Sequence, residues 1–375
     1  MQRANRLESK SSQFAFTLIA DTSEEFDDFG PYVASIDTHG VVAFFASLEE
    51  GGSGIFKGDG NAKSSSFSYS TVALSDGNPF TGFCSHPDIN DRGDLCFFAE
   101  LKAESESADP ESSPNEGVVA QTESGLVTIV DTTSTVIVNS DDRLIKIGPL
   151  GPAMNQSGMI VFRGRLQSGA EGVFSTQGDK PGHLKLIAST ASGFSAFQGI
   201  PIANENGSVT FRADLNGYGE AILVGKGDEL ATIIDTRHPA SVVGMIGSFP
   251  VSNNKGKVVF CATLKEGRAG VFQAADGKLV KLVDSTRDFE SFRGVLIDDS
   301  ENIFFYATPR NGKLGIYAYL NGSAEKIIAF GDSFANSKLK EFALNPVSIN
   351  SSGQLAIRMK LENGRQLIVR CDHAG

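Results

Sequence analysis

Residues 40–56 read G-V-V-A-F-F-A-S-L-E-E-G-G-S-G-I-F, and degraded copies of this stretch recur along the whole chain. Six further copies begin at Gly93, Gly158, Gly207, Gly256, Glu301 and Gly353. Glu301 takes the place that glycine holds in the other copies. The seven copies follow one another at a spacing of roughly 50 residues, which is the length of one β-propeller blade.

Each copy alternates apolar and variable residues. The second, fourth, sixth and eighth residues after the first glycine are Val42, Phe44, Ala46 and Leu48, and the later copies repeat this pattern. A period of two predicts a β-strand, because successive side chains of a strand point to opposite faces of the sheet. We expect this strand to be the second of its blade.

Shorter signals predict the other strands of each blade. An Asn or Asp three residues before the glycine position indicates a tight turn. G-I-F or a related tripeptide, as at Gly54 and Gly172, predicts a third strand, and a Leu/Val/Ile run ending in an acid or hydroxyl residue predicts a fourth. The seventh copy ends before its fourth strand, whereas residues 16–22 match one. We therefore predict that the N-terminal strand completes the last blade and closes the ring.

The sequence predicts an all-β fold, a seven-bladed β-propeller in a single domain over residues 14–375, after a disordered tail at residues 1–13. The 375 residues carry a net charge of -12, with 45 acidic and 33 basic side chains. This charge repels phosphate backbones and anionic membrane surfaces, so neither nucleic acid nor membrane is expected as a partner. There is no run of apolar residues long enough to span a bilayer. The polar first residues show no signal peptide, which favours the cytoplasm unless a secretory signal has been trimmed.

Blade two departs most from the repeat. Residues 102–117 form an acidic, low-complexity insertion between its second and third strands, which we interpret as a mobile surface loop. Its exit, residues 132–146, is also long, and residues 59–70 of blade one form a Ser-rich loop. In a propeller the two loops of blade two lie on the same face. We expect binding on this looped face, because added loops on a rigid scaffold carry function.

Arginines are the first candidates for a site. They stand at variable positions of the second strands: Arg163, Arg165, Arg212 and Arg358. A buried guanidinium needs partners, and the acids that end the fourth strands are the nearest candidates, so a structural network of Arg–carboxylate pairs between blades is one interpretation. The other is that the arginines on blades three and four bind an anionic ligand such as a carboxylate or a sugar acid.

The second candidate lies in the inner strand of blade two, F-C-S-H-P-D-I-N. Cys84, His86 and Asp88 alternate there, so a continuous strand would place them on one face. A histidine beside a carboxylate is a possible general base, although a histidine in an inner strand is more often simply hydrogen-bonded in place. Tyr306 of blade six is a further candidate catalytic residue.

Metal and cofactor sites are not predicted. The five histidines fall at unrelated points of the repeat, and no blade shows the D-x-D-x-D-G spacing of a calcium loop. The four cysteines, Cys84, Cys96, Cys261 and Cys371, lack C-x-x-C spacing. Cys96 and Cys261 stand at strand positions where other copies carry Val, Ala or Arg, and we interpret these two as small buried hydrophobic residues.

The motif I-N-x-x-G-x-V-x-F-x-A-x-L-x-x-G-x-x-G-I-F, followed by L-I-A-D-T, resembles a bacterial propeller-repeat family found in cyanobacterial and other environmental proteins. The resemblance extends from Phe16 to Arg370. It implies a seven-bladed propeller and carries over no functional residues, because that family has no assigned activity.

Two functions remain open from the sequence. The first is a binding or scaffolding propeller that holds a small anionic molecule or a partner protein on the looped face of blades two to four. The second is a propeller enzyme, for instance a lyase, hydrolase or natural-product tailoring enzyme, with its active site at the channel mouth. The fold alone does not decide between them.

Overall fold

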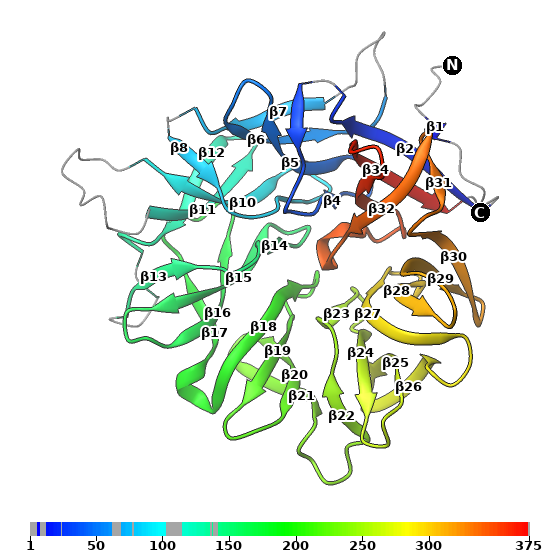
Figure 1. Cartoon of the computed structure of the whole chain (residues 1–375). Helices are drawn as coiled ribbons and strands as arrows, with labels where there is room; N and C mark the ends of the chain where they lie inside the picture. Colours follow the sequence, from blue (N-terminus) through cyan, green and yellow to red (C-terminus); the bar gives the residue numbers. More distant parts are fainter. Residues whose placement is uncertain are drawn as a thin grey trace.

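The repeats form seven antiparallel sheets arranged as blades around a central channel (Figure 1). The computed structural model describes residues 6–7, 13–23, 25–61, 69–76, 79–102, 115–135, 137 and 142–373. Each blade has an inner, a second, a third and an outer strand, and we number the blades by the repeat copy that they contain. The predicted seven-bladed all-β propeller is confirmed.

The inner strands are β3 (Phe26–Asp28), β8 (Phe80–Phe83), β13 (Leu144–Ile147), β18 (Phe194–Ala203), β22 (Val243–Ile246), β27 (Phe289–Ile297) and β32 (Ser337–Ala343). The second strands, which carry the period-two pattern, are β5 (Val42–Leu48), β10 (Leu95–Leu101), β15 (Met159–Leu166), β19 (Val209–Leu215), β24 (Val258–Leu264), β28 (Ile303–Pro309) and β33 (Leu355–Leu361). The third strands are β6 (Ser53–Gly58), β11 (Asn115–Thr122), β16 (Glu171–Gln177), β20 (Glu220–Lys226), β25 (Ala269–Ala275), β29 (Gly315–Leu320) and β34 (Gln366–His373).

The outer strands are β7 (Tyr69–Leu74), β12 (Gly125–Asp131), β17 (Lys185–Ser189), β21 (Glu229–Asp235), β26 (Lys278–Asp284), β30 (Ser323–Ala329) and β2 (Phe14–Asp21). Short strands extend several inner strands or flank blade seven: β4 (Ser35–Ile36), β9 (Asp88–Ile89), β14 (Ala153–Met154), β23 (Val251–Ser252), β31 (Ser333–Phe334) and β1 (Arg6–Leu7). The 3-10 helices of the described part are η1 (Thr190–Ser192) and η2 (Pro346–Ser348).

The N-terminal strand closes the ring, as the sequence predicts. β2 pairs antiparallel with β34, so that Phe16 lies opposite Cys371, and Figure 1 shows the blue strand beside the red one. Of the predicted tail, the structure describes Gln13 and the strand β1, which pairs with β2; residues 1–5 and 8–12 lie outside the described residues. Closure leaves no unpaired third strand in blade seven.

Both faces of each second strand are buried between blades. Phe44 of β5 packs in one cluster with Ile368 of blade seven, whereas its neighbour Phe45 packs in another cluster with Phe97 of blade two. The even positions of one blade therefore contact the odd positions of the preceding blade. The candidate arginines at odd positions consequently lie in the seams between blades.

A left-handed backbone explains the repeat glycine. The φ angle at this position lies between 76° and 84° in the six copies that carry glycine, and Glu301 adopts 67° in the sixth copy. Glycine takes such angles without steric penalty, whereas an L-residue is strained there.

The glycine of G-I-F is required for a different reason. A Cβ atom at Gly172 would lie 2.4 Å from the ring of Phe174, which folds back over the glycine. Blade four carries Ala221 at this position, and Leu223 stands where Phe174 stands in blade three. The replacement of the aromatic ring explains why blade four tolerates alanine.

Candidate functional site

The propeller has two faces, which we name by the connections that they carry. We call the face that carries the Asn/Asp-x-x-Gly turns the turn face, and the opposite one the looped face. The predicted insertions lie largely outside the described residues, at positions 103–114, 136 and 138–141 of blade two and at positions 62–68 of blade one. Nothing in the described structure therefore tests the interpretation of these loops.

Arg163 lies in the seam between blades three and four. Its Nη1 donates a hydrogen bond to the main-chain carbonyl of Phe197 in β18, and its buried Nε has no partner among the described residues. No described carboxylate lies within 4.0 Å of this guanidinium. Burial lowers the pKa of Arg163, and the nearby charge of Glu171 partly opposes this shift.

Arg212 and Arg165 do have carboxylate partners on their own blades. Arg212 Nη2 lies 2.7 Å from Glu220 Oε1, and the other oxygen of Glu220 accepts from the main-chain N–H of Ile246 in blade five. Arg165 Nη2 lies 3.6 Å from Glu171 Oε1 at an exposed position. Arg212 is the cross-strand neighbour of Gln198, so Arg163 and Arg212 both lie against β18.

Arg358 occupies the seam between blades seven and one. Its Nη2 donates to the carbonyl of Pro31 at 3.4 Å, and its buried Nε has no partner among the residues described. Burial lowers the pKa of Arg358, although the charges of Asp28 and Glu341 oppose this shift. The environment of Arg358 thus matches that of Arg163, on a distant part of the ring.

None of the described contacts joins an acid at the end of an outer strand to these arginines, which corrects the structural interpretation of the sequence. Asp131 accepts hydrogen bonds from Thr133 and Ser134 in the turn that follows it. Asp284 similarly binds Lys281 and Thr286. These acids lie at the outside of each blade and find local partners first. The arginines instead contact third-strand glutamates or carbonyls of the next blade.

His86 and Asp88 are both buried but have separate partners. β8 ends at Phe83 and β9 begins at Asp88, so the strand alternation on which the shared face rested is interrupted. His86 Nε2 lies 3.1 Å from the carbonyl of Pro152, and its ring packs on Gly151. Burial lowers the pKa of His86 to about 4.

Asp88 ties blade two to blade three. Its carboxylate accepts from the main-chain N–H groups of Ile89 at 2.9 Å and Met154 at 2.7 Å. Burial raises the pKa of Asp88 to about 7. Cys84, the third residue of the group, is half-buried and free, and burial raises its pKa. The other three cysteines are free and buried, which confirms the predicted burial of Cys96 and Cys261.

Tyr306 fills the seam between blades six and seven. Its ring lies edge-on to Phe342, with centroids 6.3 Å apart, and covers Gly294, where a Cβ atom would clash with it. Burial raises the pKa of Tyr306 above its usual range. These contacts describe a side chain packed between Phe342 of blade seven and Gly294 of the neighbouring strand β27.

A ring of hydrogen bonds on the turn face is the feature that the sequence interpretation missed. In six of the seven blades, the residue after the turn Asn or Asp donates its main-chain N–H to the corresponding residue of the next blade. These contacts are Thr38 to Asp91 (2.8 Å), Asp91 to Gln156 (2.5 Å), Gln156 to Glu205 (2.8 Å), Glu205 to Asn254 (3.0 Å), Asn254 to Asp299 (2.9 Å) and Asp299 to the carbonyl of Ser351 (3.2 Å). Asn350 Nδ2 bridges the remaining seam to the carbonyl of Asp37 at 2.7 Å.

The sequence does carry a signal for this ring, because the residue after the turn Asn or Asp is polar in every copy. Beside the ring lies a cavity of about 130 Å³, lined by polar side chains such as Gln156, Glu205 and Asn254 together with Ile36, Ile202 and Ile297. The described residues hold no group of three or more acids, histidines or cysteines that could bind a metal.

Three solved structures similar to this chain have different activities. The propeller domain of the Trilobed protease from Pyrococcus furiosus, which has an open velcro topology, matches with a TM-score of 0.56 at 10% identity over 91% of this chain and 94% of that one. The polysaccharide lyase Uly1 matches with a TM-score of 0.54 at 10% identity over 93% and 91% of the two chains. A puromycin-hydrolyzing peptidase from Mycobacterium tuberculosis matches with a TM-score of 0.51 at 11% identity over 96% of this chain, which spans 59% of that peptidase.

At these identities the similarity shows the fold alone. No curated protein matches this chain. Among the described residues there is no helix with the length and apolar character needed to cross a membrane. A family model does match, at residues 15–221 and 140–287, and it describes a family of unknown function, DUF7453. The chain therefore belongs to the DUF7453 family, whose members have no assigned function.

Proposed function

We propose that this chain is a binding propeller that holds a small anionic ligand on its looped face, at the seam between blades three and four. The observation that carries the proposal is Arg163, a largely buried guanidinium with no carboxylate within ion-pair distance among the described residues. A buried cation that is bonded to one carbonyl is incompletely compensated. An incoming carboxylate would supply the missing charge and a partner for Nε.

Arg165 extends the proposed site, whereas Arg212 lies in the next seam, between blades four and five. Arg212 lies on the far side of β18 from Arg163, where its Nη2 pairs with Glu220 beside blade five and its buried Nε has no partner among the described residues. Arg165 is exposed, and its 3.6 Å contact with Glu171 is long enough to exchange for a ligand. The ligand class is thus a small carboxylate or sugar acid, and an acidic side chain of a partner protein offers the same chemistry.

Arg358 and Asp88 take no part in this site. Arg358 borders the seam between blades seven and one, and Asp88 already accepts two main-chain hydrogen bonds. No described group favours the enzyme alternative: His86 binds a carbonyl and has its pKa lowered to about 4, and Tyr306 is packed against Gly294. Bacterial origin and a cytoplasmic location rest on the sequence alone and stay predictions.

Thermal-shift and calorimetric titrations with citrate, glucuronate and inorganic phosphate test the proposal. A ligand that binds the folded state raises the melting temperature by mass action. We expect at least one of these anions to stabilise the wild type and to lose its effect in Arg163→Gln. Glutamine keeps a donor for the Phe197 carbonyl, so the variant should fold.

Arg358→Gln is the matched control, because Arg358 has the same burial, carbonyl contact and unpaired Nε in another seam. It should keep the anion response of the wild type. Binding that survives in Arg163→Gln would place the anion elsewhere. The absence of any response, with Arg163→Gln as destabilised as Arg358→Gln, would identify both arginines as structural ties between blades and overturn the proposal.

A further inference from the structure

A second cavity opens on the turn face, in the seam between blades six and seven. Its volume is about 490 Å³. The turn of blade six contributes Asn302, the hairpin between β29 and β30 contributes Asn321, and blade seven contributes Ser352, Gln354 and Asp372. Because the cavity lies on the face opposite the proposed anionic site, it does not depend on that proposal.

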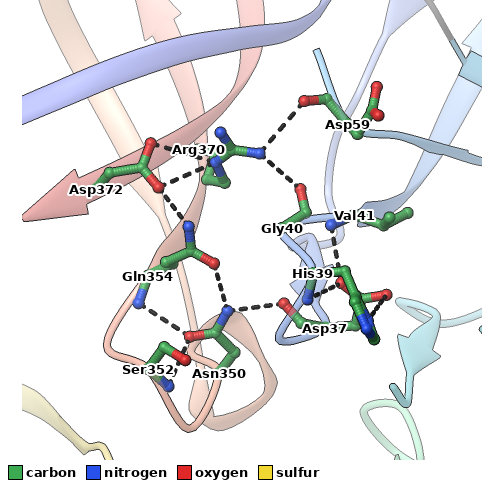
Figure 2. A network of polar contacts seen from close by, with 10 residues as sticks. All are labelled: Asp37, His39, Gly40, Val41, Asp59, Asn350, Ser352, Gln354, Arg370 and Asp372. Carbon is green, nitrogen blue, oxygen red and sulfur yellow. Dashed lines mark hydrogen bonds and ion pairs between the residues drawn. The ribbon is translucent and has the colours of Figure 1, made fainter. Parts of the chain in front are cut away.

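The cavity exists because one cross-strand pair differs between neighbouring blades. In blade seven, Ala356 pairs with Arg370, whose guanidinium reaches the next blade and donates to the carbonyls of Gly40 at 3.0 Å and Asp59 at 3.3 Å (Figure 2). In blade six the corresponding pair is Phe304 and Ala318. Alanine cannot bridge the seam to blade seven, so the space that Arg370 fills in its own seam stays open here.

The polar wall of the cavity is held in place before any ligand arrives. Gln354 donates to Asp372 and accepts from Asn350 Nδ2 at 2.7 Å, and Arg370 Nε donates to Asp372 at 3.1 Å (Figure 2). On the opposite wall, Asn302 Nδ2 donates to Asp298 at 2.7 Å. Fixed rotamers reduce the conformational entropy lost on binding.

Several polar groups remain available within this fixed frame. The hydroxyl of Ser352 and the amide of Asn321 have no side-chain hydrogen bond among the described contacts, and Asn302 keeps its amide oxygen free of one. Phe304 and Leu320 form an apolar part of the lining. Neither lysine nor arginine is found among the described residues that line the cavity, which disfavours an anion.

We propose that this cavity binds a neutral saccharide unit. Amides, hydroxyls and carboxylates both donate and accept, as vicinal hydroxyls of a sugar require, and the apolar part suits its C–H face. A divalent cation fits less well, because the carboxylates of Asp298 and Asp372 already accept hydrogen bonds from Asn302, Gln354 and Arg370.

Amide NMR titration of the full-length chain tests this site with methyl β-glucopyranoside, methyl β-galactopyranoside and methyl α-mannopyranoside, and with Ca²⁺ in a separate arm. We expect at least one glycoside to shift the amide signals of Asn302, Asn321, Ser352 and Gly353. The double variant Asn321→Gly, Ser352→Ala should weaken this binding at least tenfold. Glycine suits the left-handed backbone at Asn321, so the variant should fold.

Asn311→Gly is the matched control, because Asn311 is also exposed and left-handed but lies in the β28–β29 hairpin on the looped face. It should bind the glycoside like the wild type. The proposal is overturned if no glycoside shifts these signals, if Ca²⁺ alone shifts them, or if the double variant binds as tightly as the wild type. Arg163→Gln should leave glycoside binding unchanged, so the two proposals fail separately.

Discussion

The backbone at the first position of each repeat has a positive φ, and this geometry predicts opposite effects of two substitutions. Nothing lies within 4 Å of a Cβ atom built on Gly207, so Gly207→Ala should cost about 1 kcal/mol of unfolding free energy through backbone strain alone. Glu301→Gly relieves the same strain at φ 67° and should be neutral or stabilising by up to about 1 kcal/mol.

Urea denaturation measures both effects. The ion pair that Glu301→Gly removes, with Lys255 at 3.9 Å, is exposed and contributes little. Equal destabilisation by the two substitutions would contradict the strain argument, because it would assign the loss to side-chain contacts instead of the backbone.

Because His86 is buried with a lowered pKa, the unfolding free energy should fall in acid. The folded chain protonates this histidine near pH 4 and the unfolded chain near pH 6.5, so the unfolded state alone gains the proton between these values. The wild type should therefore lose up to about 3 kcal/mol relative to His86→Gln as the pH falls from 6.5 to 4, since one pKa unit corresponds to about 1.4 kcal/mol.

The comparison with His86→Gln is needed because Asp88, with its pKa raised to about 7, titrates over an overlapping range with the opposite sign. Its contribution cancels in the difference between the two chains. Denaturant unfolding at several pH values measures that difference. A constant difference from pH 6.5 to 4 would mean that His86 is accessible to protons in the folded chain.

At the scale of the strand, the aromatic ring two residues after the G-I-F glycine leaves no room for a side chain at the glycine. A methyl group at Gly172 would lie 2.4 Å from Phe174, which must then move within a packed seam, so Gly172→Ala should cost about 2 kcal/mol. In blade four the same position already carries Ala221 beside Leu223. Ala221→Gly is the matched control and should cost no more than about 1 kcal/mol.

Thermal or urea unfolding of the two variants checks this difference. If Gly172→Ala were as mild as Ala221→Gly, the aromatic ring would have free space to move, and its packing over the glycine would not explain the repeat residue.

The elements were predictable because their signals are local. Period-two alternation identifies the second strands, and the glycine at a positive φ identifies the turns, including the replacement Glu301. The partners of the arginines were not predictable, because they depend on which carbonyl of the next blade faces each seam, as at Phe197 and Pro31. The prediction that Cys84, His86 and Asp88 share one face was wrong. The strand is interrupted between Phe83 and Asp88, and the alternation of residue types does not reveal such an interruption.

At the scale of the whole molecule, the two faces have different roles. The turn face is crossed by a hydrogen bond at every seam, from Thr38–Asp91 to Asn350–Asp37, and these bonds fix the blades relative to one another. The looped face has no such described ring, and its seams contain the incompletely paired Arg163 and Arg358. A rigid face opposite a less constrained one is consistent with a scaffold that holds a ligand between blades.

Ring closure itself is testable by truncation. β2 buries four large apolar side chains, Phe14, Phe16, Leu18 and Ile19, in the clusters that join blade seven to its two neighbours. Their exposure would cost about 6–12 kcal/mol, comparable to the total stability of a typical domain. A chain that begins at Ser23 should therefore unfold or aggregate through the free edge of β34, as measured by thermal unfolding and light scattering. A chain that begins at Gln13 keeps β2 and should retain nearly the full melting temperature. Equal behaviour of the two truncated chains would show that six complete blades and three strands hold the ring without its closing strand.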